Sequence, residues 1–168
     1  MQYFYMALFA AGIVAADQFT KYLTVANIPL HGHVDFMPGF LGLTYVRNTG
    51  AAWSSFEGMI WLFTLIFVAL SVVIVWEFSK KRLPFTTLER WCIAAIYGGG
   101  LGNMIDRLRL GFVVDMIETE FMNFPVFNVA DCFIVVGTIV LFLLFMFVYK
   151  EKDLEFLNFK QNKYREVK

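Results

Sequence analysis

Four hydrophobic stretches separated by polar segments dominate the pattern of this 168-residue chain. They run from Met1 to about Val25, from Met59 to Trp76, from Trp91 to about Ile105, and from Cys132 to Tyr149. Each approaches the roughly 20 residues that a helix needs to cross about 30 Å of hydrocarbon. The pattern therefore predicts an all-α membrane protein with four transmembrane helices.

The first stretch is expected to be a retained span, not a cleavable signal peptide. No Lys or Arg precedes its apolar run, whereas Lys21 follows it. Asp17, Thr20, Lys21 and Thr24 share one stripe of the predicted helix, because they are spaced at i, i+3, i+4 and i+7. Asp17 and Lys21 are placed to form a salt bridge, and the stripe is expected to face protein instead of lipid.

Capping patterns predict where the last two helices begin. Thr86 and Glu89 have the Thr-x-x-Glu spacing of a capping box, so a helix is expected to start near Thr86. Asn128 is placed to cap the fourth helix, which puts Asp131 in its first turn. Gly98 and Gly102 form a Gly-x-x-x-Gly spacing, which favours close approach of another helix.

The composition agrees with lipid as the surrounding solvent, since 59% of the residues are hydrophobic and only 17% are charged. The formal net charge is zero, so nothing indicates a nucleic-acid partner, which would require a concentrated positive surface. Cys92 and Cys132 lie in apolar stretches without Cys-x-x-Cys or Cys/His spacing. They are interpreted as buried thiols, and neither a disulfide nor a zinc site is predicted.

Positive charges predict the orientation, because basic loops remain in the cytoplasm. Three basic residues lie in the first and third connecting segments: Arg47, Arg107 and Arg109. Ten lie in the second segment and the tail: Lys80, Lys81, Arg82, Arg90, Lys150, Lys152, Lys160, Lys163, Arg165 and Lys168. Both termini are therefore expected in the cytoplasm, with residues 26–58 and 106–127 on the outer face.

The predicted organisation is one membrane domain over residues 1–150, followed by a polar cytoplasmic tail over residues 151–168. Residues 26–58 are too long for a bare connector. Within them, Phe36 to Tyr45 mixes aromatic and β-branched residues with glycines, which favours short strands forming a β-like platform at the membrane surface. A partly buried Ω-like loop is the alternative.

Two aspartates are candidates for chemistry. Asp115 has apolar neighbours on both sides, so desolvation is expected to raise its pKa. Asp131 begins the fourth span, where a helix N-terminus favours the ionised form. Brought together, the two acids are able to share one proton and activate water. Spacing alone equally allows a capping carboxylate and a hydrated loop acid, and Asp106, Glu118 and Glu120 are other candidates for a pair.

Three other sites carry weaker indications. Arg107 is either an anion-binding or carbonyl-binding fork at the headgroup level, or an anchor that neutralises a nearby acid. His31, His33 and Asp35 match fixed metal-ligand geometry poorly, and no metal site is predicted. Ser54 and Ser55 have no base close in the sequence, so a serine nucleophile has little support.

Five motifs together resemble those of the lipoprotein signal peptidase, or signal peptidase II, family. They occur in the family's order and come with the expected four spans. The motifs are Asp17-Gln18-x-Thr20-Lys21, Val46-Arg47-Asn48-Thr49-Gly50-Ala51-Ala52, Gly102-Asn103-x-x-Asp106-Arg107, Val113-Val114-Asp115 and Phe127-Asn128-x-Ala130-Asp131. Two positions differ from common family choices: Trp53 stands where Phe is frequent, and Cys132 where a small Ser is common.

The resemblance implies an aspartic endopeptidase of the bacterial inner membrane, with its active site near the outer face. Asp115 and Asp131 match the catalytic aspartates. Matches to polar and supporting residues around them are Asn48, Gly50, Asn103, Arg107, Asn128, Asp17 and Lys21. The implied substrates are prolipoproteins whose cysteine carries diacylglycerol, cut on the amino side of that cysteine. Membrane lipids are the other expected partners; no metal or organic cofactor is implied, and a monomer is expected.

Two alternatives rest on the same acids. A small transporter would use Asp17, Lys21, Asp115 and Asp131 as a proton or ion relay through the bundle. In a non-catalytic membrane scaffold, the paired acids would be dispensable. The apolar cytoplasmic halves of the second and fourth spans argue against a continuous polar path.

Overall fold

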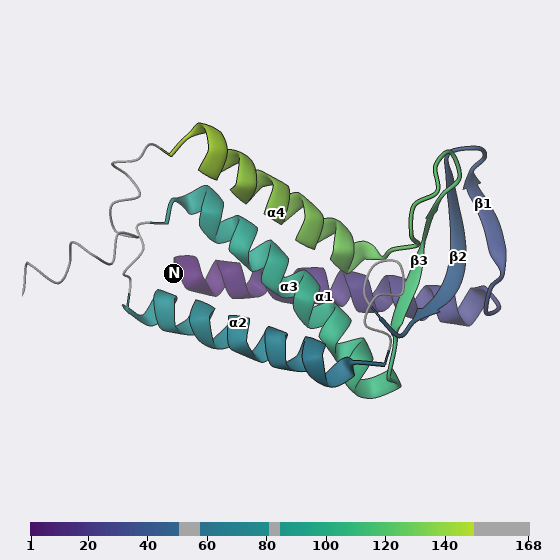
Figure 1. Ribbon diagram of the computed structural model, residues 1–168, viewed down its shortest axis with the longest axis horizontal. Helices are drawn as coiled ribbons and strands as arrows, with labels where there is room; N and C mark the ends of the chain where they lie inside the picture. The colour runs from purple at the N-terminus through teal and green to yellow at the C-terminus, as the bar shows by residue number, and fades with distance from the viewer. Residues whose placement is uncertain (51–57, 81–84, 150–168) are drawn as a thin grey trace, which may run out of the picture.

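The computed structural model describes residues 1–50, 58–80 and 85–149 (Figure 1). Successive helices run in opposite directions, and a small sheet lies across one end of the bundle (Figure 1). In the described residues the helices are α1 (Gln2–Asn27), α2 (Ile60–Lys80), α3 (Thr87–Leu110) and α4 (Val129–Phe147), and the strands are β1 (His33–Met37), β2 (Leu41–Asn48) and β3 (Val113–Thr119). The chain is thus mostly helical.

The four predicted hydrophobic stretches correspond to the four helices, but they do not all have the character of a membrane span. Only α2 and α4, of the helices described, are long and apolar enough by length and composition. The 26 residues of α1 and 24 of α3 reach about 39 and 36 Å at 1.5 Å per residue. Both carry several charged or polar residues, which lowers their hydropathy. The four-span arrangement therefore stays a prediction.

Both predicted helix caps are confirmed. Thr86 and Glu89 form a reciprocal capping box at the start of α3. Asn128 and Asp131 form a second one at the start of α4. These side chains satisfy backbone N–H groups that have no partner within the helix.

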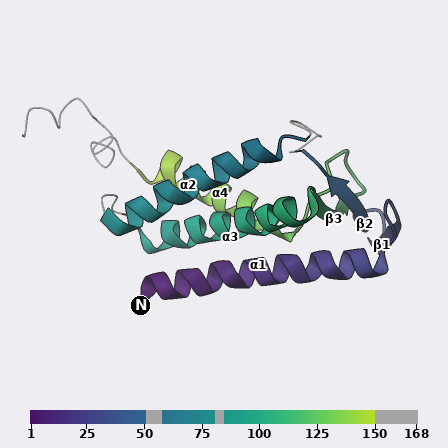
Figure 2. The same cartoon turned by 90° about the horizontal axis from the view of Figure 1, so that it is seen from below.

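Glycines allow α3 to contact its neighbours at very short range. Figure 2 shows α3 between α1 and α2. A Cβ added at Gly98 would lie 3.0 Å from the carbonyl oxygen of Ala10 in α1, and one at Gly99 would lie 2.5 Å from that of Ala130 in α4. At Gly100 it would lie 3.2 Å from the Phe67 ring in α2. The predicted close approach of another helix is therefore confirmed at Gly98, and Gly99 and Gly100 contact two further helices.

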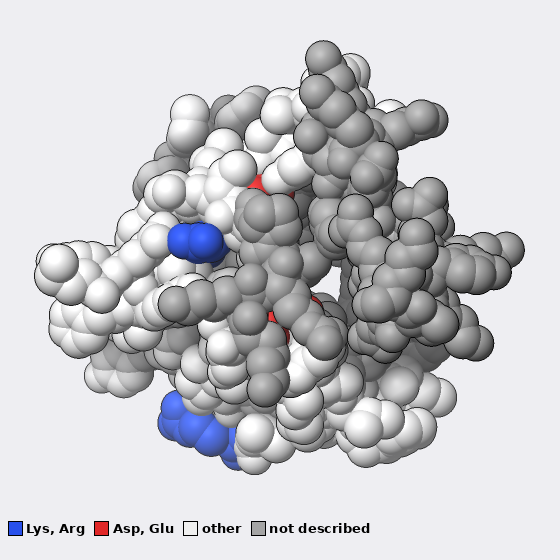
Figure 3. Space-filling view, turned by 90° about the vertical axis from the view of Figure 1, so that its left-hand side faces the viewer, with Lys and Arg blue, Asp and Glu red and all other residues white. Residues whose placement is uncertain are grey.

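Several polar and charged side chains are buried among the apolar residues of the interior, while many large apolar side chains are exposed. Six of the buried residues are Asp17, Lys21, Asn103, Asp106, Asp115 and Asn128. Large hydrophobic side chains are exposed along the helices, and no residue in the apolar window of α2 is buried. The bundle end opposite the sheet presents mainly uncharged atoms outside the grey residues (Figure 3). This distribution suits a protein surrounded by lipid, where polar groups must be satisfied internally.

The two strands within residues 26–58 were predicted, whereas the third strand was not. β1, β2 and β3 form an antiparallel sheet in that order. β3 follows the left-handed Gly111 that ends α3, and it belongs to the segment between α3 and α4. Ile28, Tyr45, Val114 and Met116 form a hydrophobic cluster that joins the sheet to the end of α1. The Ω-like alternative is therefore wrong for residues 33–48.

Some predictions concern residues outside the described ranges. These include the Ser54-Ser55 pair, the tail over residues 151–168 and most of the basic residues used to predict orientation. Arg90, which is described, donates a hydrogen bond of 2.7 Å from Nη1 to Oε1 of Gln2.

Paired glycine substitutions test the close packing of α3. Gly99→Ala places a methyl group against backbone and Ile134, so it is expected to destabilise the protein by about 1–3 kcal/mol. Gly12→Ala in α1 meets nothing within 4 Å, and is expected to be neutral or stabilising by up to about 1 kcal/mol. Thermal unfolding in detergent micelles measures both changes. Equal effects of the two variants would contradict the packing argument.

Candidate active site

A cavity of about 700 Å³ opens between α2 and α4 at the sheet end of the bundle. Its walls are mainly apolar side chains of α2, α4 and residues 124–127. Its polar lining consists of Asn48, Asn103, Arg107, Asp115 and Asp131. A largely apolar cavity with a few convergent polar groups is the usual form of a ligand site. Nine residues were predicted for the site, and five of them line this cavity.

Asp115 lies on β3 and is 2% exposed. Its Oδ2 accepts a hydrogen bond of 2.9 Å from Nδ2 of Asn48, and its Oδ1 accepts one of 2.7 Å from Nδ2 of Asn128. Asn48 lies on the adjacent strand β2. The interpretation of Asp115 as a hydrated loop acid is therefore wrong.

Asp131 lies in the first turn of α4 and has two roles in the structure. Its Oδ2 accepts a hydrogen bond of 3.1 Å from the backbone N–H of Asn128, which completes the capping box. Its Oδ1 accepts one of 2.7 Å from Nδ2 of Asn103 and lines the same cavity as Asp115. Asp131 is thus a capping carboxylate that also faces the cavity.

The amides of Asn103 and Asn128 connect the two carboxylates. Nδ2 of Asn128 donates both to Asp115 and, at 3.0 Å, to Oδ1 of Asn103. Nδ2 of Asn103 donates to Asp131. A continuous chain of hydrogen bonds therefore runs from β3 through two amides to α4, and it fixes the relative position of both acids.

A buried ammonium group supports this chain from α1. Nζ of Lys21 lies 2.8 Å from Oδ2 of Asp17, 2.9 Å from Oδ2 of Asp106 and 2.9 Å from Oδ1 of Asn103. All three donor hydrogens of the ammonium therefore have acceptors. The predicted Asp17–Lys21 salt bridge is confirmed, and Asp106 joins it.

Both acids bound to Lys21 also hold backbone beside the candidate pair. Oδ1 of Asp17 accepts a hydrogen bond of 3.0 Å from the N–H of Ala130, the residue before Asp131. Oδ2 of Asp106 accepts one of 3.1 Å from the N–H of Val114, the residue before Asp115. The network around Lys21 thus positions α4 and β3 at the two points where the candidate acids are attached.

Arg107 binds a carbonyl of the chain itself at the cavity wall. Its Nη2 donates a hydrogen bond of 3.0 Å to the carbonyl oxygen of Gly50, and its guanidinium lies 4.4 Å from the centroid of the Phe63 ring. The N–H of Gly50 in turn donates to Oδ1 of Asn48 at 2.9 Å. Arg107 and Asn48 therefore hold the end of β2 beside Asp115.

The other candidate acids do not form the pair, because they are bound elsewhere. Gln18 is an additional residue of the network around Lys21. Asp106 is bound to Lys21, and Glu118 and Glu120 bind His33 outside the cavity. The sequence predicted no role for Gln18 beyond its place in a motif. Its Nε2 donates to Oδ1 of Asp106 at 2.9 Å and to the carbonyl oxygen of Gly102 at 3.2 Å. Its position next to Asp17 was the one indication available in the sequence.

The pKa of Asp115 departs from its ordinary value in the expected direction. It is raised from 3.8 to about 6, chiefly by burial and in smaller part by the negative charge of Asp131. The hydrogen bonds from Asn48 and Asn128 act in the opposite direction, because they stabilise the carboxylate. A carboxyl group with this pKa is able to hold a proton much closer to neutral pH than an exposed aspartate.

Comparisons with known proteins place this geometry in a family. Residues 9–147 match the family model described as signal peptidase (SPase) II. A lipoprotein signal peptidase of Enterococcus faecalis is 49% identical over 138 residues, which cover 81% of this chain and 84% of that protein. One from Lactococcus lactis subsp. lactis is 45% identical over 141 residues, covering 82% and 90%.

Two solved structures described as a bacterial membrane enzyme have the same fold. One superposes with a TM-score of 0.77 at 32% identity, and covers 84% of this chain and 87% of that one. The other has a TM-score of 0.76 at 32% identity, and covers 84% and 92%.

Removal of the buried ammonium tests the support network. Lys21→Met leaves Asp17 and Asp106 without their shared cation, so we expect a loss of about 3–5 kcal/mol of stability in thermal unfolding. Adding Asp17→Asn and Asp106→Asn to Lys21→Met is expected to recover part of this loss, because no unpaired charge then remains buried. Tyr22→Phe, at a side chain that is 68% exposed, is the control and is expected to change stability by less than about 0.5 kcal/mol. A Lys21→Met protein as stable as this control would contradict the role assigned to the ammonium.

Proposed function

The chain belongs to the signal peptidase II family, and from this premise we propose that it cleaves lipid-modified bacterial prolipoproteins with Asp115 and Asp131 as its catalytic pair. Membership makes it a peptidase of the aspartic type that removes signal peptides from prolipoproteins. The transporter and scaffold alternatives lose their basis, since both treated the acids as something other than a peptidase site.

The observation that carries the proposal is the position of the two aspartates. They line the same cavity, and Asn103 and Asn128 connect them through hydrogen bonds. The other acids near them in the sequence are bound elsewhere. Two carboxyls that share a site do not both ionise readily, so one retains a proton while the other remains charged.

The proposed reaction uses this difference in protonation. The ionised carboxylate accepts a proton from a water molecule, whose oxygen attacks the scissile carbonyl carbon. The protonated carboxyl donates its hydrogen bond to the carbonyl oxygen and stabilises the charge that develops there. Collapse of the tetrahedral intermediate breaks the C–N bond, and the leaving amine takes up a proton from the pair.

Three groups of polar residues support the pair without exchanging protons with the substrate. Asn103 and Asn128 hold the carboxyl groups in position. Asp17 and Lys21 hold the backbone and amides behind them. Asn48, Gly50 and Arg107 fix the end of β2, where an extended substrate backbone is proposed to lie.

The shape of the cavity supports a lipid-modified peptide as the substrate. Its polar residues lie at the sheet end, and apolar side chains of α2 and α4 form most of the remaining wall. A diacylglyceryl-cysteine would keep its acyl chains in the bilayer while the peptide crosses the two aspartates. Cleavage is proposed on the amino side of that cysteine. The mechanism requires neither a metal ion nor an organic cofactor.

The proposed arrangement in the membrane rests on the four hydrophobic stretches and on the distribution of basic residues along the sequence. Residues 1–150 form one domain of four spans in the inner membrane, with both termini and the tail over residues 151–168 in the cytoplasm. The sheet, including the strands within residues 26–58, then lies on the outer face. This puts the acids near the interface, where water is available and where ionisation costs less than at mid-bilayer. The protein is proposed to act as a monomer and to bind no nucleic acid.

Replacement of either aspartate tests the catalytic assignment. Asp115→Asn and Asp131→Asn each remove the carboxyl needed to hold or accept the proton, so turnover of a diacylglyceryl prolipoprotein is expected to fall by about a thousandfold or more. A gel-shift assay with purified protein measures the cleaved product. Both variants are expected to keep binding the lipidated substrate.

The matched control makes the same carboxyl-to-amide change at Glu77 of α2, which does not line the cavity. Glu77→Gln is expected to process substrate at the wild-type rate. Processing by both Asn variants at that rate would refute the assignment of Asp115 and Asp131.

The pH dependence of cleavage tests the role of Asn48. With the pKa of Asp115 near 6, kcat/KM is expected to fall above about pH 6 as the pair loses its last proton. Asn48 stabilises the charged form of Asp115, so Asn48→Ala removes a contribution that lowers this pKa. The descending limb is therefore expected to move to higher pH in the variant. A limb that stays in place, or moves to lower pH, would contradict the proposed contact.

A further inference from the structure

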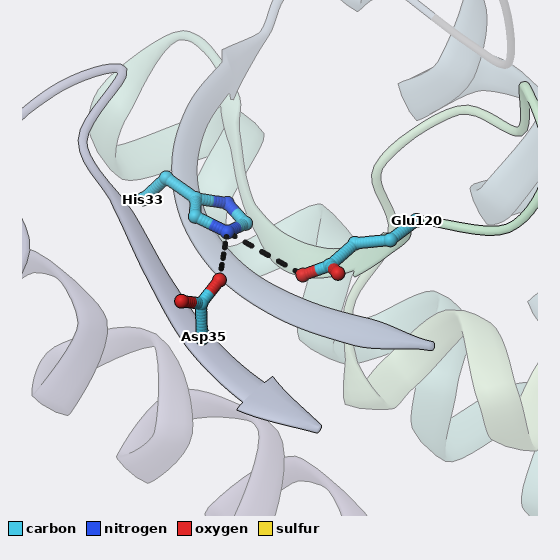
Figure 4. A group of neighbouring side chains, drawn as sticks. All are labelled: His33, Asp35 and Glu120. Carbon is cyan, nitrogen blue, oxygen red and sulfur yellow. Dashed lines mark hydrogen bonds and ion pairs between the residues drawn. The ribbon is translucent and has the colours of Figure 1, made fainter. Parts of the chain in front are cut away.

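A second group of ionisable side chains lies on the sheet, outside the cavity. Nδ1 of His33 lies 3.1 Å from Oε2 of Glu118. Its Nε2 lies 3.1 Å from Oδ1 of Asp35 and 3.4 Å from Oε1 of Glu120 (Figure 4). Three carboxylates thus surround one imidazole. Even with His33 protonated, the four groups carry a net negative charge.

The register of the sheet explains why these side chains meet. Asp35, Gly42 and Glu118 form one row across β1, β2 and β3. His33 and Glu120 lie two residues away from members of this row, so they project from the same face. Gly42 occupies the centre, where an added Cβ would clash with the imidazole Cε1 of His33 and lie 2.9 Å from Oε1 of Glu120. The missing side chain leaves the space in which the ring reaches both neighbouring strands.

The two ring nitrogens have different surroundings. A neutral imidazole has one N–H donor and one bare nitrogen. With the proton on Nδ1, the ring donates to Glu118, and the lone pair of Nε2 faces two carboxylate oxygens. That arrangement is repulsive, and either a second proton on Nε2 or a metal cation bound between the three atoms relieves the repulsion. In many zinc sites a carboxylate likewise holds the second ring nitrogen of a histidine ligand.

The spacing of the three atoms suits a small tetrahedral ion. Zn²⁺ binds nitrogen and carboxylate oxygen at about 2.0–2.2 Å, which separates neighbouring ligand atoms by roughly 3.3 to 3.6 Å. The distances of 3.1 and 3.4 Å from Nε2 are close to this, and all three ligand atoms lie within 4.8 Å of one another. His33 and Asp35 are well exposed, which leaves access from solvent and room for a water molecule at the fourth position.

We propose that His33, Asp35 and Glu120 bind a Zn²⁺ ion on the outer sheet, with Glu118 orienting the imidazole. The ion links β1, at the edge of the sheet, to the turn after β3. Glu120 is also joined to the β1–β2 turn, because its Oε2 accepts a hydrogen bond of 2.6 Å from the N–H of Gly39. The site is independent of the peptidase reaction, since none of its residues lines the cavity.

The sequence did not indicate this site, because two of its three carboxylates come from a distant segment. His31, His33 and Asp35 alone match metal geometry poorly, and His31 is not part of the group. Glu118 and Glu120 join it only through the pairing of β2 with β3. The ligand set is therefore a product of the third strand.

The full chain, purified in detergent micelles with any histidine tag removed and stripped of metal with EDTA, tests the proposal by calorimetric titration with ZnCl₂. One saturable site is expected. Mg²⁺ should not compete, because it prefers about six oxygen ligands in octahedral geometry. His33→Asn and Glu120→Gln are expected to weaken Zn²⁺ binding by at least about tenfold, and Glu118→Gln by about 10- to 100-fold. Saturating Zn²⁺ should also raise the unfolding temperature of the wild type but not of His33→Asn.

His31→Asn is the matched control, because it removes the other histidine of the same segment. His31 has a φ of 62°, in the left-handed region that Asn tolerates, and the variant should bind Zn²⁺ as the wild type does. Retained prolipoprotein cleavage in all four variants verifies that they are folded. Absence of saturable binding by the wild type would overturn the proposal, as would full binding by His33→Asn and Glu120→Gln, or an equal loss in His31→Asn.

Discussion

A single buried ammonium organises this protein. Nζ of Lys21 satisfies Asp17, Asp106 and Asn103 at once, in a bundle whose outer surface is almost entirely apolar. An unpaired charge at this position would cost several kcal/mol, so the three partners and the ammonium must be present together. Through these partners, α1 holds the backbone before Asp115, the backbone before Asp131 and the amide chain between their carboxyls. The positions of both acids therefore depend on a group that belongs to neither of their elements.

The sequence predicted most of the local structure, because the relevant interactions are short-range. The capping box at Thr86, the cap at Asn128 and the i,i+4 pair of Asp17 and Lys21 each need only neighbouring residues. The glycines of α3 also indicated close packing without the structure. Helix number and position followed from hydropathy, although α1 and α3 are too polar to be recognised as spans by composition alone.

The contacts of the site could not be predicted by spacing, because they join residues far apart in the chain. Asn48 and Asp115 are 67 residues apart, and Asp17 and Ala130 are 113 apart. By spacing alone, four acids could have paired with Asp131: Asp106, Asp115, Glu118 and Glu120. In the structure Glu118 and Glu120 contact His33, and Asp106 is bound to Lys21. The strand itself was missed although Val113, Val114 and Ile117 follow Gly111, a pattern that favours extended structure. The resemblance of the motifs to a known family predicted the pair of acids, and the geometry shows what surrounds them.

Asn128 belongs to two systems that are usually separate. Its side-chain oxygen accepts a hydrogen bond from the N–H of Asp131 and so begins α4, while its Nδ2 donates to Asp115. Both contacts are made by one planar amide, so a rotation of the Asn128 side chain that breaks one hydrogen bond also changes the other. Without the first turn of α4, Asn128 and Asp131 are not held in these positions. Asp115 and Asp131 then do not lie together at the cavity. On the proposed mechanism, a chain whose last helix has not completed the bundle is therefore inactive as a peptidase towards neighbouring polypeptides.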